Sequence, residues 1–274
     1  MSQIARAVAT LLNAEVVAAE ALGGGCLEQV TRVTLADGRR TVAKGGPAPR
    51  VEADMLRALS AAGVPTPAVL AVDEAVLVMS ERPNSGSLGD AWGDLGQVLA
   101  TLHACLAPAG EADPGPYGWD DDYAYGPIAL PNERHAHWPA FWAERRLLPH
   151  LGRLPPALAR RVEALADDLP NRLPDRPQAS LLHGDMWSGN VLVEADRVSA
   201  LIDPACYYGH AEVDLAMLTL FGSPDQRFWA AYPREPGWRE RQPIYQLWPG
   251  IVHLVLFGSG YRPLVEGLLE AARA

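Results

Sequence analysis

The chain has 274 residues, of which 49% are hydrophobic and 20% charged, and its formal net charge is −10. This composition is typical of a globular protein and excludes a disordered chain, while the length allows two modest domains that share a cleft. Because the net charge is negative, we expect no nucleic-acid partner and no anionic membrane partner, and an anionic ligand would need a local positive group or a bound metal ion.

Cysteines and apolar runs give a first indication of the compartment. Cys26, Cys105 and Cys206 are too few and too widely spaced to predict a disulfide framework or a CxxC metal site. Charged residues interrupt the N-terminal apolar run, which argues against a signal peptide, and no stretch has the roughly 18 apolar residues that a membrane span needs. We therefore expect a cytoplasmic protein.

The first 80 residues predict a small α+β lobe. Apolar residues at helical spacing from Ile4 to Val16 indicate an opening helix, which the glycines at 23–25 end. A second helix is predicted over residues 51–62, closed by Gly63. Alternating and apolar runs around turn residues predict two hairpins, and we expect the lobe to form an antiparallel sheet. The predicted strands are residues 30–35, 41–44, 69–72 and 75–79.

Beyond residue 80 the pattern becomes mainly helical. The polar segment that follows, rich in Gly and Pro, is the predicted linker. Helical spacing recurs around residues 95–102, 138–151 and 156–169 and from 245 onward, and short apolar runs lie at 181–182, 191–193 and 200–202. The predicted fold class is therefore α+β and bilobal. Its parts are a small N-lobe (1–80), a linker (81–89) and a larger, mainly helical C-lobe (90–274).

The strongest chemical signal lies between two of these apolar runs. The loop His183–Asn190 carries Asp185 and Asn190, and Asp203 follows the next apolar run. Phosphoryl transfer needs a group that accepts the proton of the acceptor hydroxyl and oxygen ligands for Mg²⁺. An Asp and an Asn separated by four residues, followed by a metal-binding Asp, is the kinase catalytic-loop arrangement. These polar groups could instead satisfy turn backbone, but their combination favours Asp185 as base and Asn190 and Asp203 as metal ligands.

The first lobe offers an independent check of this interpretation. A kinase-like lobe places a Lys on a strand after a Gly-rich turn and a Glu on the following helix. Lys44 ends the run Val42-Ala43-Lys44, and Glu52 begins the next predicted helix. We expect Lys44 to bind the phosphates of ATP and Glu52 to orient its ammonium group. Gly23, Gly24 and Gly25 are candidates for the nucleotide loop, although they match no phosphate-binding motif and could simply cap the helix.

Eight segments distributed along the chain carry a family resemblance. They are residues 23–26, 52–56, 95–103, 138–147, 183–190, 202–209, 212–217 and 253–261. With these segments the chain resembles the fructosamine kinase (ketosamine-3-kinase) family, which is related to aminoglycoside phosphotransferases and choline kinases and has a bilobal protein-kinase-like fold. The Trp-Ser-Gly-Asn segment 187–190 and the Asp-Pro-Ala segment 203–205 separate this family from its neighbours.

The resemblance implies an ATP-dependent, Mg²⁺-requiring kinase with Asp185 as the base. The adenine site would lie at the linker, near Met79, Ser80 and Glu81. The acceptor would be the 3-hydroxyl of a ketoamine, small or protein-bound, whose phosphorylation leads to deglycation. The protein would be a monomer or a homodimer, and Cys26 would match a cysteine that forms a regulatory intersubunit disulfide in some members, although a small residue tolerated in a turn explains it equally well.

Two aromatic residues are candidates for contact with the acceptor. Trp187 would stack on the sugar or its amine substituent or pack as an apolar residue, and His253 would face the same pocket or be a core histidine. The sequence departs from the family pattern at His210–Ala211, where Asp-Arg is usual, and at Ile128 and Leu130. Such departures near a pocket would change which acceptor is tolerated.

Two alternatives remain open from the residues. The same machinery could act on another small alcohol, as in an aminoglycoside- or choline-type phosphotransferase. The chain could also be a nucleotide-binding protein without catalysis. Assays of ADP release with ketoamines and with aminoglycosides distinguish the first alternative from a ketosamine kinase. ATP binding without phosphate transfer would indicate the second.

Overall fold

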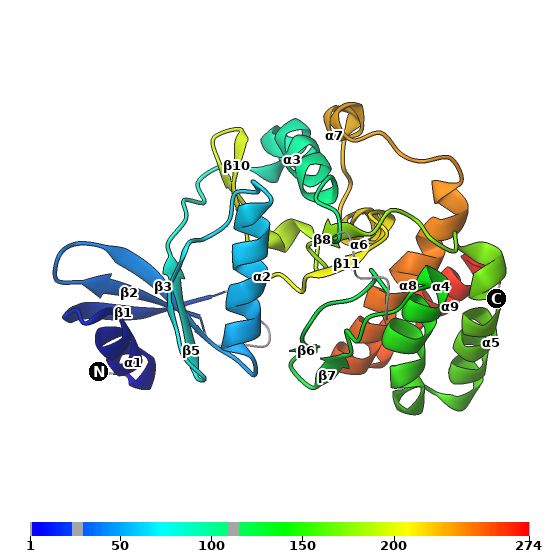
Figure 1. Ribbon diagram of the computed structural model, residues 1–274, viewed down its shortest axis with the longest axis horizontal. Helices are drawn as coiled ribbons and strands as arrows, with labels where there is room; N and C mark the ends of the chain where they lie inside the picture. Colours follow the sequence, from blue (N-terminus) through cyan, green and yellow to red (C-terminus); the bar gives the residue numbers. More distant parts are fainter. Residues whose placement is uncertain (1, 24–29, 109–114, 274) are drawn as a thin grey trace.

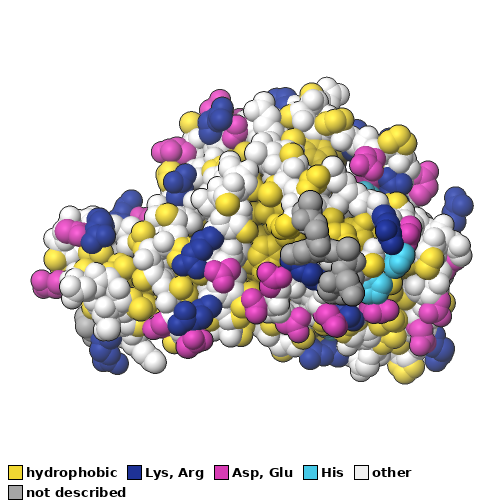
Figure 2. Space-filling model, viewed as in Figure 1, with side chains coloured by type: hydrophobic (Ala, Val, Ile, Leu, Met, Phe, Trp, Pro, Cys, Tyr) yellow, Lys and Arg dark blue, Asp and Glu magenta, His cyan; other side chains and the backbone are white. Residues whose placement is uncertain are grey.

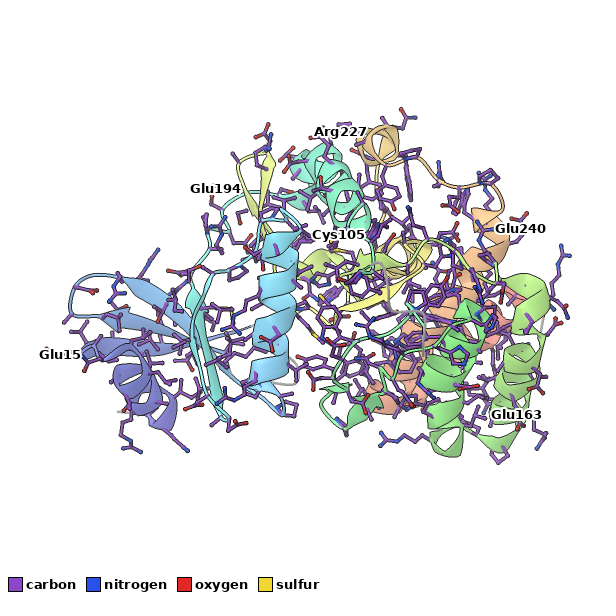
Figure 3. The ribbon with its side chains drawn as sticks, in the orientation of Figure 1. Glu15, Cys105, Glu163, Glu194, Arg227 and Glu240 are labelled. Carbon is purple, nitrogen blue, oxygen red and sulfur yellow. The ribbon has the colours of Figure 1, made fainter. Side chains whose placement is uncertain are left out.

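The computed structural model describes residues 2–23, 30–108 and 115–273. Figure 1 shows a small part containing the N-terminus and a larger, mainly helical part beside it. Acidic and basic side chains are interspersed over the face in Figure 2, and side chains such as Glu15 and Glu163 lie at the periphery in Figure 3. Within the described ranges, no helix combines the length and the apolar character that crossing a bilayer requires.

The smaller part is built on a five-stranded antiparallel sheet in the order β1-β2-β3-β5-β4. Alternation along a strand sends successive side chains to opposite faces. Val76 and Val78 of β5 pack with the core under α1, whereas Leu77 and Met79 pack with α2 on the other face. The elements are α1 (Gln3–Leu12), β1 (Val16–Leu22), β2 (Val30–Leu35), β3 (Arg40–Gly45), α2 (Pro49–Ala61), β4 (Val69–Val72) and β5 (Val76–Ser80).

The first helix is shorter than its apolar spacing predicts. Asn13 adopts a left-handed backbone (φ 46°) and donates its N–H to Ala9, which ends the helix. Val16, predicted as helical, begins β1, where β-branched residues are favoured. Gly23 therefore follows a strand, and the prediction that it ends a helix is wrong. Gly24, Gly25 and Cys26 lie outside the described residues.

The larger part contains α3 to α9 and three two-stranded hairpins or pairs around one large core. The α helices are α3 (Leu88–His103), α4 (Trp138–Trp142), α5 (Pro156–Arg172), α6 (Glu212–Phe221), α7 (Gln226–Ala231), α8 (Trp238–Phe257) and α9 (Arg262–Ala271). The strands are β6 (Tyr123–Tyr125), β7 (Ile128–Leu130), β8 (Ser180–Leu182), β9 (Val191–Glu194), β10 (Arg197–Leu201) and β11 (Tyr207–Gly209). A π-helical turn (Ala143–Leu147) and a 3-10 turn (Leu148–Arg153) continue α4.

Helix α2 joins the two parts. Its Ala53 and Leu56 pack against the sheet, while Met55 and Leu59 belong to the core of the larger part. The Met55 sulfur accepts a hydrogen bond from the N–H of Cys206 at 3.3 Å. The described residues 81–87, between β5 and α3, form neither helix nor strand and connect the sheet to the larger part. The α2 helix and this segment therefore fix how the two parts face each other.

Candidate active site

The loop between β8 and β9 holds the sequence-predicted base. Gly184 has φ +81°, and a Cβ there would lie 1.9 Å from the carbonyl oxygen of Ala205, so only glycine fits. The buried carboxylate of Asp214 accepts the N–H groups of His183 at 2.8 Å and Gly184 at 2.9 Å. His103 approaches the same carboxylate at 3.0 Å. The backbone that leads into Asp185 is thereby fixed by α6 and α3.

Asp185 and Asn190 are in direct contact. The Asn190 side-chain nitrogen donates to Asp185 Oδ2 at 3.0 Å and to the Asp185 carbonyl at 2.8 Å. Burial raises the pKa of the Asp185 carboxyl to about 7, although the hydrogen bond from Asn190 opposes this rise. A carboxylate with a pKa near neutrality suits a group that accepts a proton in the reaction. Its burial and its contact with Asn190 are compatible with the predicted role of Asp185 as a base.

Lys44 connects the sheet to the candidate catalytic loops, which are the loop His183–Asn190 (the candidate catalytic loop) and the segment around Asp203. Its Nζ lies 2.9 Å from Glu52 Oε1 on α2 and 3.0 Å from Asp203 Oδ1 beyond β10. The side chains of Lys44 and Glu52 are buried, while that of Asp203 is 42% exposed. The buried ammonium group is thus paired with two carboxylates. The sequence-predicted pair Lys44–Glu52 and the predicted Asp203 therefore lie together in space.

Asn190 and Asp203 can hold a divalent cation. The pairing of Val191 with Leu201 in the β9–β10 hairpin, and the bond from the Ile202 N–H to the Asn190 carbonyl at 3.0 Å, bring the two residues to the same end. Because the Asn190 amide nitrogen donates to Asp185, its amide oxygen is the atom that can face a cation. One amide oxygen and one carboxylate form the hard, sparse donor set that Mg²⁺ accepts together with water and phosphate oxygens. The residues present fit this ion.

A cavity of about 1180 Å³ lies between the sheet and the larger part. It is large for a single small ligand and has room for a nucleotide beside an acceptor. Its lining includes the predicted site residues Gly23, Lys44, Met79, Ser80, Glu81, Asp185, Trp187, Asn190, Asp203 and His253. Glu52 supports the cavity from behind through Lys44. Predicted residues that lie far apart in the sequence, from Gly23 to His253, therefore border one space.

The linker end of the cavity carries Glu81, whose carboxylate already has cationic partners. Glu81 pairs with Arg32 at 2.5 Å and with Arg40 at 2.7 Å. The next residue, Arg82, donates from Nε to the carbonyl of Ser199 at 3.0 Å and so attaches the linker to β10. The Glu81 side chain is therefore engaged with arginines, and the backbone N–H of the neighbouring Ser80 donates to the Ala68 carbonyl at 2.9 Å within the sheet.

The opposite end of the cavity is aromatic. The His253 Nδ1–H donates to the Pro249 carbonyl at 2.8 Å, and the ring lies 4.4 Å from that of Phe221 and 5.1 Å from that of Tyr261. Burial lowers the pKa of His253, so its imidazole is neutral at pH 7. Trp187 is 39% exposed and lies across Gly189, where a Cβ would come within 2.2 Å of the indole. His253 is thus both hydrogen-bonded locally and part of the cavity wall.

Comparison with known proteins identifies the family. A sequence model described as fructosamine kinase matches residues 1–273. The chain belongs to the fructosamine kinase family. A Synechocystis protein named "Probable ketoamine kinase" is 37% identical over 193 residues, which are 66% of this chain and 62% of that protein, so the chain spans less than two thirds of this relative. A Thermus thermophilus protein of the same name is 35% identical over 252 residues, 88% of either chain.

Solved structures agree with the family and with the fold. A crystal structure of a fructosamine-3-kinase-type protein from Thermobifida fusca is 36% identical, superposes with a TM-score of 0.88 and covers 99% of both chains. An aminoglycoside phosphotransferase covers 100% of this chain and 95% of its own, with a TM-score of 0.66 and 17% identity. This second likeness concerns the fold alone. The predicted bilobal, protein-kinase-like α+β fold is confirmed.

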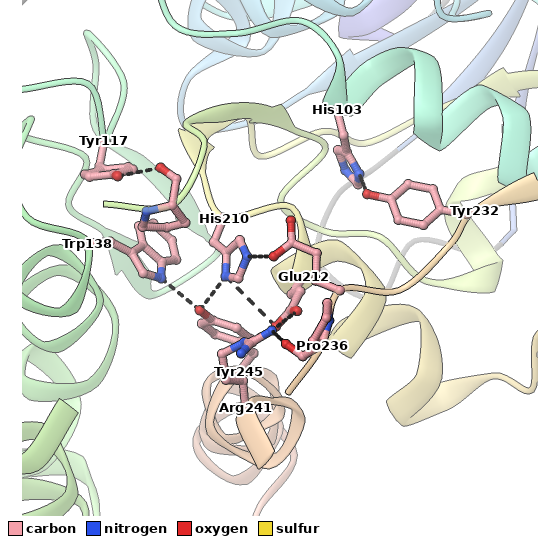
Figure 4. Close-up of polar contacts among 11 residues, drawn as sticks. His103, Tyr117, Trp138, His210, Glu212, Tyr232, Pro236, Arg241 and Tyr245 are labelled. Carbon is pink, nitrogen blue, oxygen red and sulfur yellow. Dashed lines mark hydrogen bonds and ion pairs between the residues drawn. The ribbon is translucent and has the colours of Figure 1, made fainter. Parts of the chain in front are cut away.

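The departures from the fructosamine kinase pattern lie outside the cavity. Among the described residues that line it, neither His210 nor Ala211 appears, and Ile128 and Leu130 are buried on the inner face of the β6–β7 hairpin. His210 instead contacts the Tyr245 hydroxyl through Nδ1 at 2.7 Å, as Figure 4 shows. His210, Ile128 and Leu130 are buried and Ala211 is half-buried, so the expectation that these positions change which acceptor is tolerated stays a prediction.

Around His210 the core carries its own ion pair. Trp138 donates its indole N–H to the Tyr245 hydroxyl at 2.9 Å, and Arg241 of α8 pairs with Glu212 at 2.6 Å and 2.8 Å (Figure 4). The family pattern has Asp-Arg at positions 210–211, where this chain has His210 and Ala211. Here Arg241, from a distant helix, places a cation beside Glu212. Burial, with Arg241 nearby, lowers the pKa of His210 to about 3. This network stabilises the start of α6 behind the catalytic loop.

Sequence reasoning missed three residues of the site. Asp214, Tyr123 and Tyr125 contact the catalytic loop or Glu52 through hydrogen bonds of 2.8–3.2 Å. Asp214 lies in a segment that the family resemblance includes, but nothing in its spacing indicates a contact 30 residues away in sequence. The two tyrosines lie on a three-residue strand, which is too short for its alternation to be recognised.

Proposed function

We propose that this protein is an ATP-dependent kinase that phosphorylates a sugar hydroxyl of a ketosamine, of the fructosamine or ribulosamine type, and thereby takes part in deglycation. The observation that carries the proposal is the contact of Lys44 Nζ with Asp203 at 3.0 Å, because it joins the sheet and the catalytic loops at one cavity. Membership of the fructosamine kinase family supports the acceptor class.

The nucleotide would lie at the linker end, with its base against the backbone of residues 79–81. Lys44 would bind its phosphate oxygens, since the ammonium is fixed by Glu52 and faces the cavity. Asn190 and Asp203 would hold Mg²⁺, which when bound supplies positive charge for the phosphate oxygens. As in other kinases, the work left to the protein is positioning and charge stabilisation.

Asp185 would accept the proton of the attacking hydroxyl. Its carboxylate is oriented by Asn190 and lies on the cavity between the linker end and the aromatic end. A hydroxyl bound against Oδ1 or Oδ2 would face the end of the nucleotide, so the proton leaves as the oxygen attacks phosphorus. Gly184 and Asp214 keep the loop in the conformation that this approach needs.

The aromatic end would bind the sugar and its amine substituent. Among the described residues that line the cavity, the acidic ones are Glu81 at the linker end, Asp185 and Asp203. The aromatic end, within the described part of the chain, has none. An apolar or aromatic wall favours the planar faces and aliphatic stems of a single-amine adduct over a polycationic aminoglycoside, whose ammonium groups would require carboxylates. Trp187 and His253 are the proposed contacts.

Incubation with γ-labelled ATP and a panel of acceptors tests the proposal. The panel contains fructosamine and ribulosamine derivatives of an aliphatic and an aromatic amine, an aminoglycoside and choline. We expect label in the ketoamine products and no label on the aminoglycoside or choline. Label on the aminoglycoside or choline alone would replace the ketosamine assignment, and nucleotide binding without transfer to any acceptor would contradict a kinase.

A further inference from the structure

Two tyrosines of the β6–β7 hairpin reach opposite halves of the candidate active site. The Tyr123 hydroxyl donates to Glu52 Oε2 at 3.2 Å, and the Tyr125 hydroxyl donates to the Gly184 carbonyl at 3.1 Å. Residues two apart on a strand project from the same face, so one face of the hairpin presents both hydroxyl groups. One hydroxyl contacts the ion pair of the smaller part, and the other contacts the peptide that precedes Asp185.

At the first contact, the two oxygens of Glu52 have different donors. Lys44 Nζ donates to Oε1 at 2.9 Å, and Tyr123 donates to Oε2. Both Tyr123 and Glu52 are buried, so water competes little for the carboxylate. With both oxygens engaged, rotation of the Glu52 carboxylate would break one of the bonds. Tyr123 therefore restrains the group that orients Lys44.

At the second contact, the Gly184 peptide unit is held from both sides. Its N–H donates to Asp214 Oδ1 at 2.9 Å, and its carbonyl accepts from Tyr125. Gly184 has the left-handed φ of +81°, and glycine there has more rotational freedom than any other residue. Asp185 follows directly, so a rotation of this peptide would displace the carboxylate. The Tyr125 bond limits that rotation.

The hairpin itself is attached firmly to the larger part. Buried Arg146 donates to the Pro131 carbonyl at 2.7 Å and to Asn132 Oδ1 at 2.8 Å, directly after β7. The N–H of Asn132 donates to Asp122 Oδ1 at 2.7 Å, which closes the base of the hairpin. The Tyr123–Glu52 bond consequently crosses from a fixed element of the larger part to α2 of the smaller one.

We propose that Tyr123 and Tyr125 are positioning residues that hold Lys44–Glu52 and Asp185 in register across the two parts of the molecule. The hairpin acts as a brace between the two parts. Tyr123 restrains the orientation of Lys44 through Glu52, and Tyr125 restrains the position of Asp185 through Gly184. This inference rests on the proposed kinase function. It predicts that the two hydroxyls affect different kinetic constants, because one acts on the nucleotide side and the other on the base.

Removal of single hydroxyls tests the brace. Tyr123→Phe should raise KM for ATP and the dissociation constant of AMP-PNP about tenfold, whereas Tyr125→Phe should lower kcat about tenfold and leave AMP-PNP affinity within twofold. The matched control is Tyr117→Phe, because the Tyr117 hydroxyl also donates to a backbone carbonyl, that of Pro177, away from the cavity. This variant should keep both constants. All assays are run well below the lowest Tm of the set.

A double variant separates positioning from general loosening. If Tyr123 acts through Glu52, Tyr123→Phe should have less than a twofold further effect on ATP KM in a Glu52→Gln background. The inference would be overturned if Tyr123→Phe had equal effects in both backgrounds, or if Tyr123→Phe and Tyr125→Phe both kept the wild-type constants. In either case, turnover by the wild-type protein would leave the proposed function intact. A wild-type protein that binds no AMP-PNP would overturn both.

Discussion

Lys44 is shared between two carboxylates that belong to different parts of the molecule, Glu52 on α2 and Asp203 beyond β10. In the proposed function, this ammonium group would pass from Asp203 to the phosphates of the nucleotide while Glu52 still holds it. Asp203 itself has a left-handed backbone (φ 53°), which is uncommon for a non-glycine residue and often marks a functional position. At the residue scale, the charged groups of the site thus hold one another in place.

Replacement of Asp185 by Asn tests the base directly. The amide keeps the size of the side chain and a contact with Asn190, but it cannot accept a proton near neutral pH. We expect turnover to fall by about 10²–10⁴-fold while AMP-PNP affinity changes less than threefold. ADP release and calorimetry measure the two quantities. Asp196→Asn, an exposed position in the β9–β10 turn, is the control, and an unchanged turnover in Asp185→Asn would refute the assignment.

Gly189→Ala tests the role of Trp187 without altering Trp187. The new Cβ would lie 2.2 Å from the present position of the indole, so the ring must move away from the loop. If Trp187 contacts the acceptor, KM for the acceptor should rise about fivefold to tenfold with ATP KM unchanged. Gly152→Ala is the matched control, because a Cβ there meets no described heavy atom within 4 Å. Equal acceptor KM in both variants would assign Trp187 to packing.

At the element scale, several short structures position the site and differ in how far the sequence predicts them. The strands β2, β3, β4 and β5 and helix α2 follow from apolar alternation and turn residues, and their prediction is confirmed. The short strands β8, β9 and β10 coincide with the apolar runs at 181–182, 191–193 and 200–202, whereas β6, β7 and β11 were not predicted, because three-residue strands carry no periodic signal. Which strands pair depends on contacts between residues far apart in sequence. Leu182 of β8, for example, pairs with Tyr207 of β11.

Arg146 illustrates how one buried side chain maintains such an element. Its guanidinium donates to the chain just after β7 and lies 4.2 Å over the Tyr207 ring. Arg146→Met should lower the free energy of unfolding by about 2–4 kcal/mol, because the Asn132 and Pro131 oxygens lose buried donors. Urea titration measures the change. Arg160→Met, exposed on α5, should change it by less than about 0.5 kcal/mol, and equal changes would contradict the role given to Arg146.

At the scale of the whole molecule, the two parts are joined by α2, by the linker and by side-chain contacts across the cavity. The core of the larger part includes Met55 and Leu59 of α2, so the helix belongs to both packing units. Glu52 lies on the same helix, so a displacement of either part would also displace Glu52. Relative movement of the parts on nucleotide binding would therefore act on the Lys44–Glu52 pair.

Global stability should fall in mild acid because His210 is buried in its neutral form. Its folded pKa, about 3, is below the unfolded value of 6.5, so the unfolded chain binds more protons between these values and stability is lost as the pH falls from 6.5 towards 3. The loss from one such group is at most about 1.4 kcal/mol per pH unit. The groups that face the imidazole are Tyr245, Glu212, Glu235, Arg241 and His103.

His210→Gln isolates this contribution. Glutamine can still contact the Tyr245 hydroxyl but does not titrate, so the variant should lose less stability than the wild type between pH 6.5 and 5. Urea unfolding at several pH values measures the slopes. If the two proteins show the same slope, the acid sensitivity comes from other groups and the neutral state of His210 has no part in it.

The sequence by itself determined the class of fold and predicted the chemistry of the site. Asp185, Asn190, Asp203, Lys44 and Glu52 were recognisable because their spacing matches kinase sequence motifs. The fold class followed from apolar periodicity, which depends only on near neighbours. Their roles remain predictions until the variants are assayed. The tertiary structure alone decided which distant groups support them, such as Asp214, Tyr123 and Arg241. These contacts join residues 29 to 71 positions apart, and no local pattern specifies a partner at that separation.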